Sequence, residues 1–361
     1  LWSRGLGDVY KRQAFMMPTI MMIMNGLSLA IYWIGAVLIN DAQDMQEKFT
    51  LFSDMVVFSS YAMQVVMSFM MLVMIFIMLP RASVAAKRIL EVLDTEPSIE
   101  DGTRDTFPVM KDGEVEFKDV SFKYPDAEEY VLEHISFSAK KGETIAFIGA
   151  TGCGKSTAIN LIPRFYDATE GEVFVDGVNV KEYTQEALHN KIGYVSQKAI
   201  LFSGTIADNV AYGENGKAPA TQDDIAMAVK VAQASEFVEK KDQGYDGYVA
   251  QGGSNFSGGQ KQRLSIARAI ARQPEILIFD DSFSALDYKT DRILREALRK
   301  ECKDATKIIV AQRIGTIRDA DKIIVLDDGQ IAGMGTHDEL MKNCEVYQEI
   351  AYSQLSKEEL A

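Results

Sequence analysis

The chain has 361 residues, of which 47% are hydrophobic and 25% are charged, and it carries a formal net charge of −14. This length favours two or three domains, and the acidic balance argues against a nucleic acid partner, because a phosphate backbone requires a basic face. Cys153, Cys302 and Cys344 lie far apart without metal-ligand spacing, so they are interpreted as reduced cytosolic thiols rather than a metal site.

The first thirteen residues are expected to lie outside the natural fold. The stretch SRGLGDVYKRQ, residues 3–13, has no hydrophobic period and stops where an apolar run begins. It resembles the translation of a transposase adapter used in DNA library preparation, so residues 1–13 are excluded from the fold prediction as an adapter-derived scar. On this interpretation, further membrane-spanning segments are expected upstream. The alternative is a short basic cytosolic segment.

Two long runs without charge follow, residues 14–40 and residues 55–80. Each would extend roughly 38 Å as a helix at 1.5 Å per residue, and about 20 apolar residues suffice to cross a bilayer. The sequence therefore predicts two membrane-spanning helices within residues 14–80. The alternative is a pair of buried helices in a large soluble core. The acidic loop 41–54 is expected outside the cell, and the basic residues that begin at Arg81 are expected in the cytosol.

After the second run the pattern changes twice. Apolar spacing at Val84, Ile89, Leu90 and Leu93 predicts that the helix continues into the cytosol, and residues 81–113 are interpreted as this extension and a linker. From Glu114 onwards, short strand-like runs such as TIAFIG, IGYVS, ILIFD, KIIVA and KIIVL alternate with helical stretches. Near-continuous apolar strands separated by helices predict an α/β domain with a parallel core sheet.

The strongest local signal is a phosphate-binding loop. Gly149, Gly154, Lys155 and Ser156 fit the pattern G-x-x-x-x-G-K-S/T between a predicted strand and a predicted helix. Glycines let backbone N–H groups surround phosphate oxygens, and the helix N-terminus adds positive potential. Lys155 is expected on the β and γ phosphates and Ser156 on Mg²⁺. The full predicted loop is Gly149, Ala150, Thr151, Gly152, Cys153, Gly154, Lys155, Ser156 and Thr157. Cys153 is either a small filler or a reactive thiol.

Three segments follow in order: NFSGGQKQRLSIARAI, then ILIFD, then SALD. Their order and spacing resemble those of the ATP-binding cassette (ABC) family, and the resemblance extends from Gly113 to about Leu355. The two apolar runs and LPRASVAAKRILEVLD resemble the last two helices of an ABC exporter's membrane domain. The resemblance implies a P-loop α/β nucleotide-binding domain over residues 114–355. It would combine a parallel core sheet, an antiparallel β subdomain and an α-helical subdomain, and a truncated all-α transmembrane segment of two helices would precede it.

The resemblance also implies roles for single residues, with ATP and Mg²⁺ as cofactors. Tyr124 would stack on adenine, although the residue alone is equally consistent with a core aromatic. Gln197 would touch Mg²⁺ and sense the γ phosphate, Asp280 would hold Mg²⁺ together with Ser156, and Asp287 would reach across a dimer interface. The segment Ser257, Gly258, Gly259 and Gln260 would cap a nucleotide bound by a partner subunit.

Two positions depart from the family's active pattern. Asp281 stands where a glutamate polarises the attacking water, and its side chain is one methylene, or about 1.5 Å, shorter, while errors near 1 Å cost on the order of 100-fold. Gln312 stands where a histidine is expected, and an amide takes up no proton near neutral pH. Asp281, Gln312, Gln197 and Lys155 are therefore the predicted catalytic residues of an impaired site. The histidines, His134, His189 and His337, are interpreted as ordinary surface or turn residues.

The leading hypothesis is one half of a heterodimeric multidrug-type exporter in the plasma membrane, which binds Mg-ATP well and hydrolyses it slowly. Its intact signature segment would complete the competent site of a second half-transporter. Two alternatives stay open: a homodimeric exporter that hydrolyses with Asp281, and a nucleotide-gated scaffold without transport. The exported small molecule is not identified by the sequence.

Overall fold

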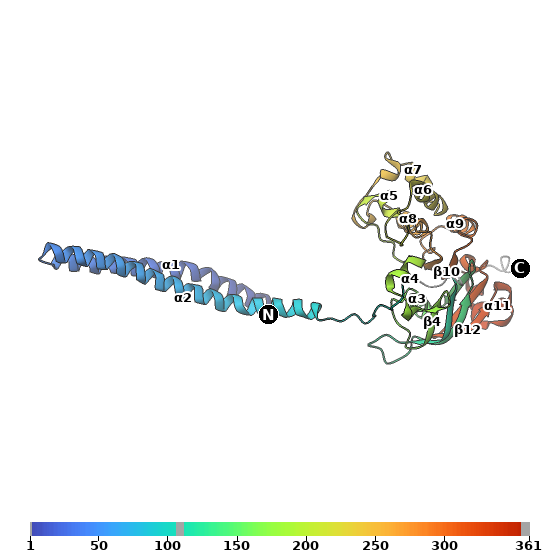
Figure 1. The fold of residues 1–361 in the computed structure, drawn as a ribbon, viewed down its shortest axis with the longest axis horizontal. Helices are drawn as coiled ribbons and strands as arrows, with labels where there is room; N and C mark the ends of the chain where they lie inside the picture. The colour runs from blue at the N-terminus through green and yellow to red at the C-terminus, as the bar shows by residue number, and fades with distance from the viewer. Residues whose placement is uncertain (1, 106–111, 355–361) are drawn as a thin grey trace. The chain divides into compact units, whose positions relative to one another are not determined.

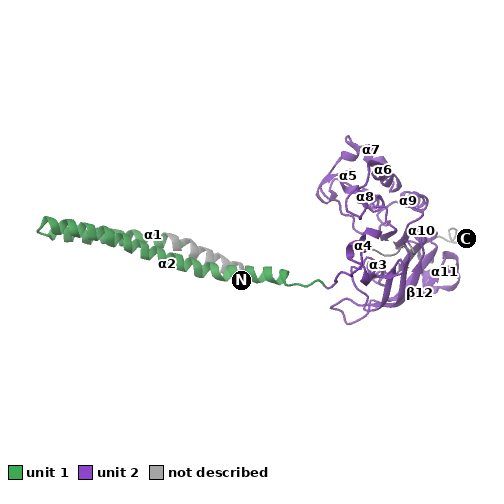
Figure 2. Ribbon diagram, viewed as in Figure 1, with its two compact units in different colours: residues 1–97 green, residues 98–361 purple. Residues whose placement is uncertain are grey.

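A computed structural model describes residues 2–105 and 112–354, with side chains described for Phe15 and from Pro18 onwards. The chain divides into two compact units, residues 1–97 and residues 98–361 (Figure 2). Each unit is described by itself.

The first unit is a helical hairpin. Helix α1 covers Trp2–Asp41 and helix α2 covers Met45–Leu93. Within these helices, Pro18–Asp41 and Met45–Leu93 are long and apolar enough to cross a membrane. Large apolar side chains such as Met71 and Phe76 are 70% and 66% exposed. Such exposure suits a lipid environment and does not suit the alternative of helices buried in a soluble core.

The two helices approach closely at Gly35. A Cβ atom added to Gly35 would lie 2.3 Å from the Sδ atom of Met55, so a larger residue there would force the Met55 side chain to move. Further along the hairpin, the Ser28 hydroxyl lies 3.6 Å from the Sδ atom of Met63. Small residues commonly permit such close packing between membrane helices, where no hydrophobic effect drives association.

The second unit is built on a six-stranded sheet in the order β12-β11-β3-β10-β9-β6. Its five parallel strands confirm the predicted parallel core, and β12 pairs antiparallel at one edge. The strands cover β3 Thr144–Gly149, β6 Ile192–Val195, β9 Ile276–Asp280, β10 Thr306–Val310, β11 Lys322–Asp327 and β12 Gln330–Gly335.

A separate antiparallel sheet has the order β2-β1-β4-β5, as the resemblance implies. Its strands cover β1 Val115–Phe122, β2 Leu132–Ala139, β4 Glu170–Val175 and β5 Val178–Asn179. A short ribbon pairs β7 Gly204–Thr205 with β8 Tyr248–Val249.

The helices of this unit vary from 4 to 14 residues. They cover α3 Lys155–Asn160, α4 Gln185–Lys191, α5 Ile206–Val210, α6 Gln222–Val231, α7 Ser235–Glu239, α8 Gly258–Ala271, α9 Tyr288–Glu301, α10 Ile314–Ile317, α11 His337–Asn343 and α12 Glu345–Gln354. Helices α5–α8 gather at one end of the unit, away from β12 and β4 (Figure 1). This is the predicted helical subdomain, so the predicted fold class is confirmed.

The core sheet separates two hydrophobic clusters. Ile145 and Phe147 of β3 belong to the cluster shared with the antiparallel sheet, while Ala146 and Ile148 belong to the cluster shared with the helices. Alternate side chains of a strand face opposite sides of its sheet, and both sides of β3 are covered. This explains why β3 reads as a continuous apolar run, and it places the polar residues that follow β3 and β9 at the carboxyl edge of the sheet.

The expectation that His337 is an ordinary surface or turn residue is wrong. His337 is only 8% exposed, and its Nδ1 atom lies 2.7 Å from the Tyr347 hydroxyl. The contact joins α11 to α12, two helices whose packing the sequence pattern does not reveal. Burial, together with nearby Arg318, lowers the pKa of His337 below its usual value of 6.5.

This burial predicts a loss of stability in mild acid. Because the folded state holds the His337 pKa below its unfolded value, the unfolded chain binds more protons as the pH falls below about 6.5. The melting temperature of the ATP-binding unit is therefore expected to fall by a few degrees between pH 7 and pH 5.5, and His337→Asn, which keeps a hydrogen-bonding atom near Nδ1, should reduce that fall. An unchanged pH dependence in His337→Asn would contradict the assignment.

Candidate nucleotide site

The loop between β3 and α3 has the backbone that a phosphate cradle requires. Gly149, Gly152 and Gly154 have positive φ angles of 153°, 92° and 96°, which glycine adopts far more readily than other residues. At Gly149 space is also decisive, because an added Cβ atom would lie 2.0 Å from the carbonyl oxygen of Leu326. Helix α3 then begins at Lys155, as predicted, so its first N–H groups point into the loop.

Lys155 lies inside this loop. Its side chain is 8% exposed, and its Nζ donates to the carbonyl oxygens of Gly149 at 2.8 Å and Ala150 at 2.6 Å. The Sγ atom of Cys153 lies 3.5 Å from the same Nζ. The ammonium group is therefore held over the loop backbone, where it can add charge to the N–H groups that face a bound phosphate.

The next residue reaches a second strand. The Ser156 hydroxyl donates to Oδ1 of Asp280 at 2.7 Å, at the carboxyl end of β9. A hydroxyl and a carboxylate are the oxygen ligands that Mg²⁺ prefers, and Mg²⁺ in nucleotide sites needs few protein ligands because phosphates and water supply the others. Ser156 and Asp280 therefore fit a nucleotide-bound Mg²⁺.

The carboxylate of Asp281 is enclosed by two amide side chains. Asp281 is 7% exposed. Its Oδ2 accepts from Nε2 of Gln312 at 2.8 Å and from Nε2 of Gln197 at 3.2 Å. The backbone carbonyl oxygen of Gln312 in turn accepts from Nε2 of Gln354 at 2.7 Å. Gln197 thus contacts Asp281, and within the described residues it makes no hydrogen bond to Ser156 or Asp280.

The surroundings of Asp281 shift the pKa of its carboxyl group. Burial raises the pKa of the Asp281 carboxyl above its usual value, and the neighbouring Asp280 adds to the rise, while the hydrogen bond from Gln197 opposes it. A higher pKa makes a carboxylate a better proton acceptor. The two amides, however, already occupy Oδ2, and an amide nitrogen donor takes no proton from it. Both amide hydrogen bonds of Gln197 and Gln312 thus converge on the same oxygen of Asp281.

Tyr124 lies in an aromatic cluster beside the loop. Its ring centroid is 5.0 Å from that of Phe122 and 5.2 Å from that of Tyr166, both edge to face. Its hydroxyl is 3.1 Å from Oγ1 of Thr157, which ties it to α3. The ring is half-buried, so part of its surface stays accessible beside the loop.

The signature segment forms the N-terminus of α8. Ser257 is the N-cap residue, and its side chain and that of Gln260 form a reciprocal capping box. The side chain of Gln260 is thus engaged by its own helix. Asp287 is the N-cap residue of α9, and its Oδ1 accepts from the backbone N–H of Thr290 at 3.0 Å. Ser257, Gly258 and Asp287 are exposed.

The signature segment and the phosphate loop are not brought together. Within residues 2–105 and 112–354, no hydrogen bond or ion pair joins Ser257–Gln260 to residues 149–157. Instead, a Cβ atom on Gly259 would lie 3.2 Å from the carbonyl oxygen of Ala285, so the segment lies beside the one that carries Asp287. An exposed helix N-terminus of this kind suits an anionic ligand.

Sequence reasoning missed several residues that support the site. The Tyr194 hydroxyl lies 2.9 Å from Oδ1 of Asn160 and 3.3 Å from Oδ2 of Asp280. Gln262, which is 2% exposed, donates from Nε2 to the carbonyl oxygen of Ser196 at 3.2 Å, next to Gln197. The one available signal was the position of Tyr194, on the strand that ends just before Gln197.

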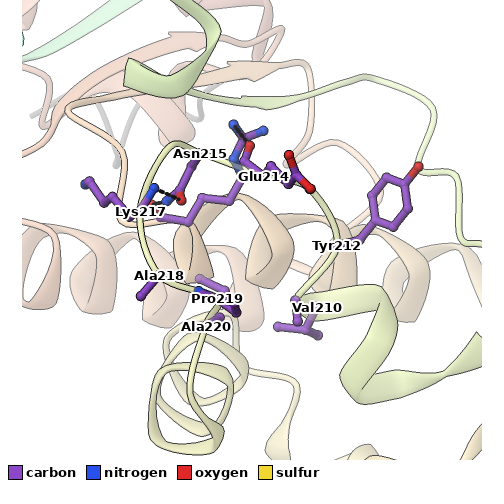
Figure 3. A pocket seen from close by; sticks show the side chains of 12 residues that line it. Val210, Tyr212, Glu214, Asn215, Lys217, Ala218, Pro219 and Ala220 are labelled. Atoms are coloured by element: carbon purple, nitrogen blue, oxygen red, sulfur yellow. Dashed lines mark hydrogen bonds between the residues drawn. The ribbon is translucent and has the colours of Figure 1, made fainter. Parts of the chain in front are cut away.

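One cavity of this unit lies outside the predicted nucleotide site. It has a volume of about 440 Å³ and is lined by residues 210–215, 217–220, 271 and 272 (Figure 3). None of the predicted site residues lines it. Two hydrogen bonds lie within its lining. Asn215 Nδ2 donates to the Arg272 carbonyl oxygen at 2.6 Å, and Arg272 Nη2 donates to the Glu214 carbonyl oxygen at 2.8 Å. The cavity thus lies beside the carboxyl end of α8 and is distinct from the nucleotide site.

Comparison with known proteins agrees with this geometry. Residues 132–284 match the profile described as "ABC transporter". The chain is 45% identical over 343 residues to an uncharacterized ABC transporter ATP-binding protein of Mycobacterium tuberculosis, a match that covers 95% of this chain and 58% of that protein. It is 42% identical over 276 residues to the ATP-dependent lipid A-core flippase of Haemophilus influenzae, with 76% and 46% covered.

A solved structure covers nearly the whole chain. The structure of a bacterial Atm1-family ABC exporter with ATP bound superimposes with a TM-score of 0.80 at 30% identity, over 99% of this chain and 61% of that one. The chain thus spans less than two thirds of the length of each of these relatives.

Proposed function

Because this chain belongs to the ABC transporter family and has the fold of its exporters, we propose that it is the ATP-binding and permease half of an exporter. ATP binding and hydrolysis would be coupled to the export of a small molecule across the plasma membrane. The two apolar helices α1 and α2 support a membrane location. A nucleotide held between two ATP-binding domains can drive such a cycle, since it binds the closed state more tightly than the open one.

In this proposal the chain's own residues bind Mg-ATP. The backbone N–H groups of residues 149–157 and the Lys155 ammonium hold the phosphates, and Tyr124 stacks on adenine. Ser156 and Asp280 hold Mg²⁺, which neutralises phosphate charge when bound. Gln197 senses the γ phosphate through its contact with Asp281, since that contact must loosen if its amide turns towards the nucleotide.

We further propose that hydrolysis at this site is slow. The observation that carries the proposal is the pairing of Asp281 with Gln312 at 2.8 Å. The short carboxylate holds its oxygen back from a water placed in line with the γ phosphate, and a displacement of about 1 Å costs on the order of 100-fold. Gln312 adds a neutral donor where a proton carrier would help, and Gln354 holds it in place.

A slow site gives the chain a role in a pair. The exposed N-terminus of α8, with Ser257, Gly258, Gly259 and Gln260, would cap the nucleotide of a second half-transporter, and Asp287 would lie at the same interface. The partner is expected to carry a competent hydrolytic site. The chain would then complete the partner's hydrolytic site with its α8 segment. Its own site would mainly bind ATP and hold the two subunits together.

Measurement of ATP turnover with and without a partner tests this proposal. The full chain in detergent or nanodiscs is expected to bind ATP and show turnover on the order of 100-fold below that of a complex with a competent half-transporter. In the complex, Ser257→Arg in this chain should abolish most turnover, because it blocks the partner's nucleotide. Rapid steady-state turnover by the chain alone would instead support a homodimer that uses Asp281.

A further inference from the structure

Tyr194 of β6 places a hydroxyl group between two elements of the nucleotide site. Its oxygen lies 2.9 Å from Oδ1 of Asn160, on α3, and 3.3 Å from Oδ2 of Asp280, at the end of β9. The ring packs edge to face on Phe165 with centroids 5.5 Å apart. A phenol has one proton to donate, so at any moment it serves one of the two oxygens.

Asp280 is therefore contacted through both of its carboxylate oxygens. Oδ1 accepts from the Ser156 hydroxyl at 2.7 Å, and Oδ2 faces the Tyr194 hydroxyl. The terminal torsion of an aspartate is otherwise broad. Contacts at both oxygens fix the plane of the carboxylate, which is the property that a metal ligand or an acceptor for metal-bound water needs.

We propose that Tyr194 is a positioning residue for the Mg²⁺ site, which holds the Asp280 carboxylate in the orientation that receives the metal. The inference rests on the proposed Mg-ATP site and adds to it a residue outside the phosphate loop. Residues that orient a metal ligand typically affect metal affinity by 10- to 100-fold. The 3.3 Å distance to Asp280 favours the lower end, about 10-fold.

Tyr194→Phe tests this with the loss of one oxygen atom. ATP affinity of the full chain is measured over a range of MgCl₂ concentrations and in excess EDTA. The Mg²⁺ midpoint is the Mg²⁺ concentration that gives half of the Mg²⁺-dependent gain in ATP affinity. In Tyr194→Phe this midpoint is expected to rise by about 10-fold. The ATP affinity of this variant in EDTA should equal that of the unmodified chain, since the phosphate loop and Tyr124 are untouched.

Two further variants separate positioning from packing. Tyr183→Phe makes the same chemical change at a buried tyrosine whose hydroxyl donates to the Val175 carbonyl oxygen at 3.1 Å, and it should leave the Mg²⁺ midpoint unchanged. Asn160→Leu removes the other acceptor of the Tyr194 hydroxyl, so the proton is left for Asp280. Its midpoint should stay within about 2-fold of the unmodified value or move to lower Mg²⁺.

The outcomes are distinguishable. An unchanged midpoint in Tyr194→Phe, or an equal loss of ATP affinity with and without Mg²⁺, overturns the positioning role. The positioning role also fails if Asn160→Leu shifts the midpoint as much as Tyr194→Phe does, because the tyrosine would then act through α3. If the unmodified chain binds ATP equally well with and without Mg²⁺, the proposed roles of Ser156 and Asp280 fail first, and the inference fails with them.

Discussion

ATP turnover at this chain's own site is expected to rise by about 100-fold when Asp281→Glu and Gln312→His are combined in the complex with a competent partner. Glutamate extends the carboxylate by about 1.5 Å towards the water that attacks the γ phosphate. Histidine replaces the Gln312 amide, which now lies 2.8 Å from the carboxylate, with a group that can carry a proton near neutral pH. The partner used for this measurement carries an inactivated phosphate loop of its own, so that the remaining ATP turnover comes from this chain's site.

The two single variants complete a cycle that measures the cooperation between these positions. Asp281→Glu alone should recover part of the rate, because Gln312 still donates to the carboxylate. Gln312→His alone should recover little, because the carboxylate stays short. If the double variant folds and binds ATP yet its turnover stays flat, the short carboxylate is not what slows the site.

A small cost in stability is expected with the gain in rate. Asp281 has a positive φ of 44°, a conformation that aspartate tolerates better than most residues other than glycine and asparagine. Its backbone N–H also donates to the Val310 carbonyl oxygen at 3.1 Å. Aspartate at this position therefore suits the backbone conformation, although its side chain is shorter than that of glutamate. A slightly lower melting temperature is expected for the variants that carry Asp281→Glu, and it should be measured for each variant.

The sequence predicted those parts of the site that are contiguous in the chain. Residues 149–157 lie together, their glycines have the positive φ angles that the motif requires, and α3 starts at Lys155. The apolar strands were also recognisable, because β3 and β9 are covered on both faces. The order of these strands in the sheet could not be predicted, because strand pairing depends on contacts between residues far apart in the chain.

Contacts across the sheet could not be read from the pattern. Gln197 and Asp281 are 84 positions apart, and Tyr194 and Asp280 are 86 apart. A family resemblance assigns a role to Gln197 but does not say which oxygen its amide meets, and it draws no attention to Tyr194. Likewise, Gln260 was expected on a partner's nucleotide, while its side chain also closes the capping box of α8.

Lys155→Met is expected to lower ATP affinity by about 10- to 100-fold, because it removes the only charged side chain in the predicted phosphate loop. The same substitution also leaves the carbonyl oxygens of Gly149 and Ala150 without their donor. Part of the damage could therefore come from a disturbed loop, and a matched control is needed to separate charge from structure.

Lys307→Met supplies that control. Lys307 is 4% exposed, and its Nζ donates to the carbonyl oxygens of Ala305 at 2.8 Å and Gly142 at 3.4 Å, so both lysines are buried on two backbone carbonyls. Lys307 stands near the start of β10, whereas the phosphate loop follows the end of β3, its parallel neighbour. Both variants should lose about 1–3 kcal/mol of unfolding free energy, measured by denaturant titration, but only Lys155→Met should lose ATP. Equal losses of ATP affinity would mean that a buried lysine supports binding through stability alone, and the assignment of Lys155 to the phosphates would fail.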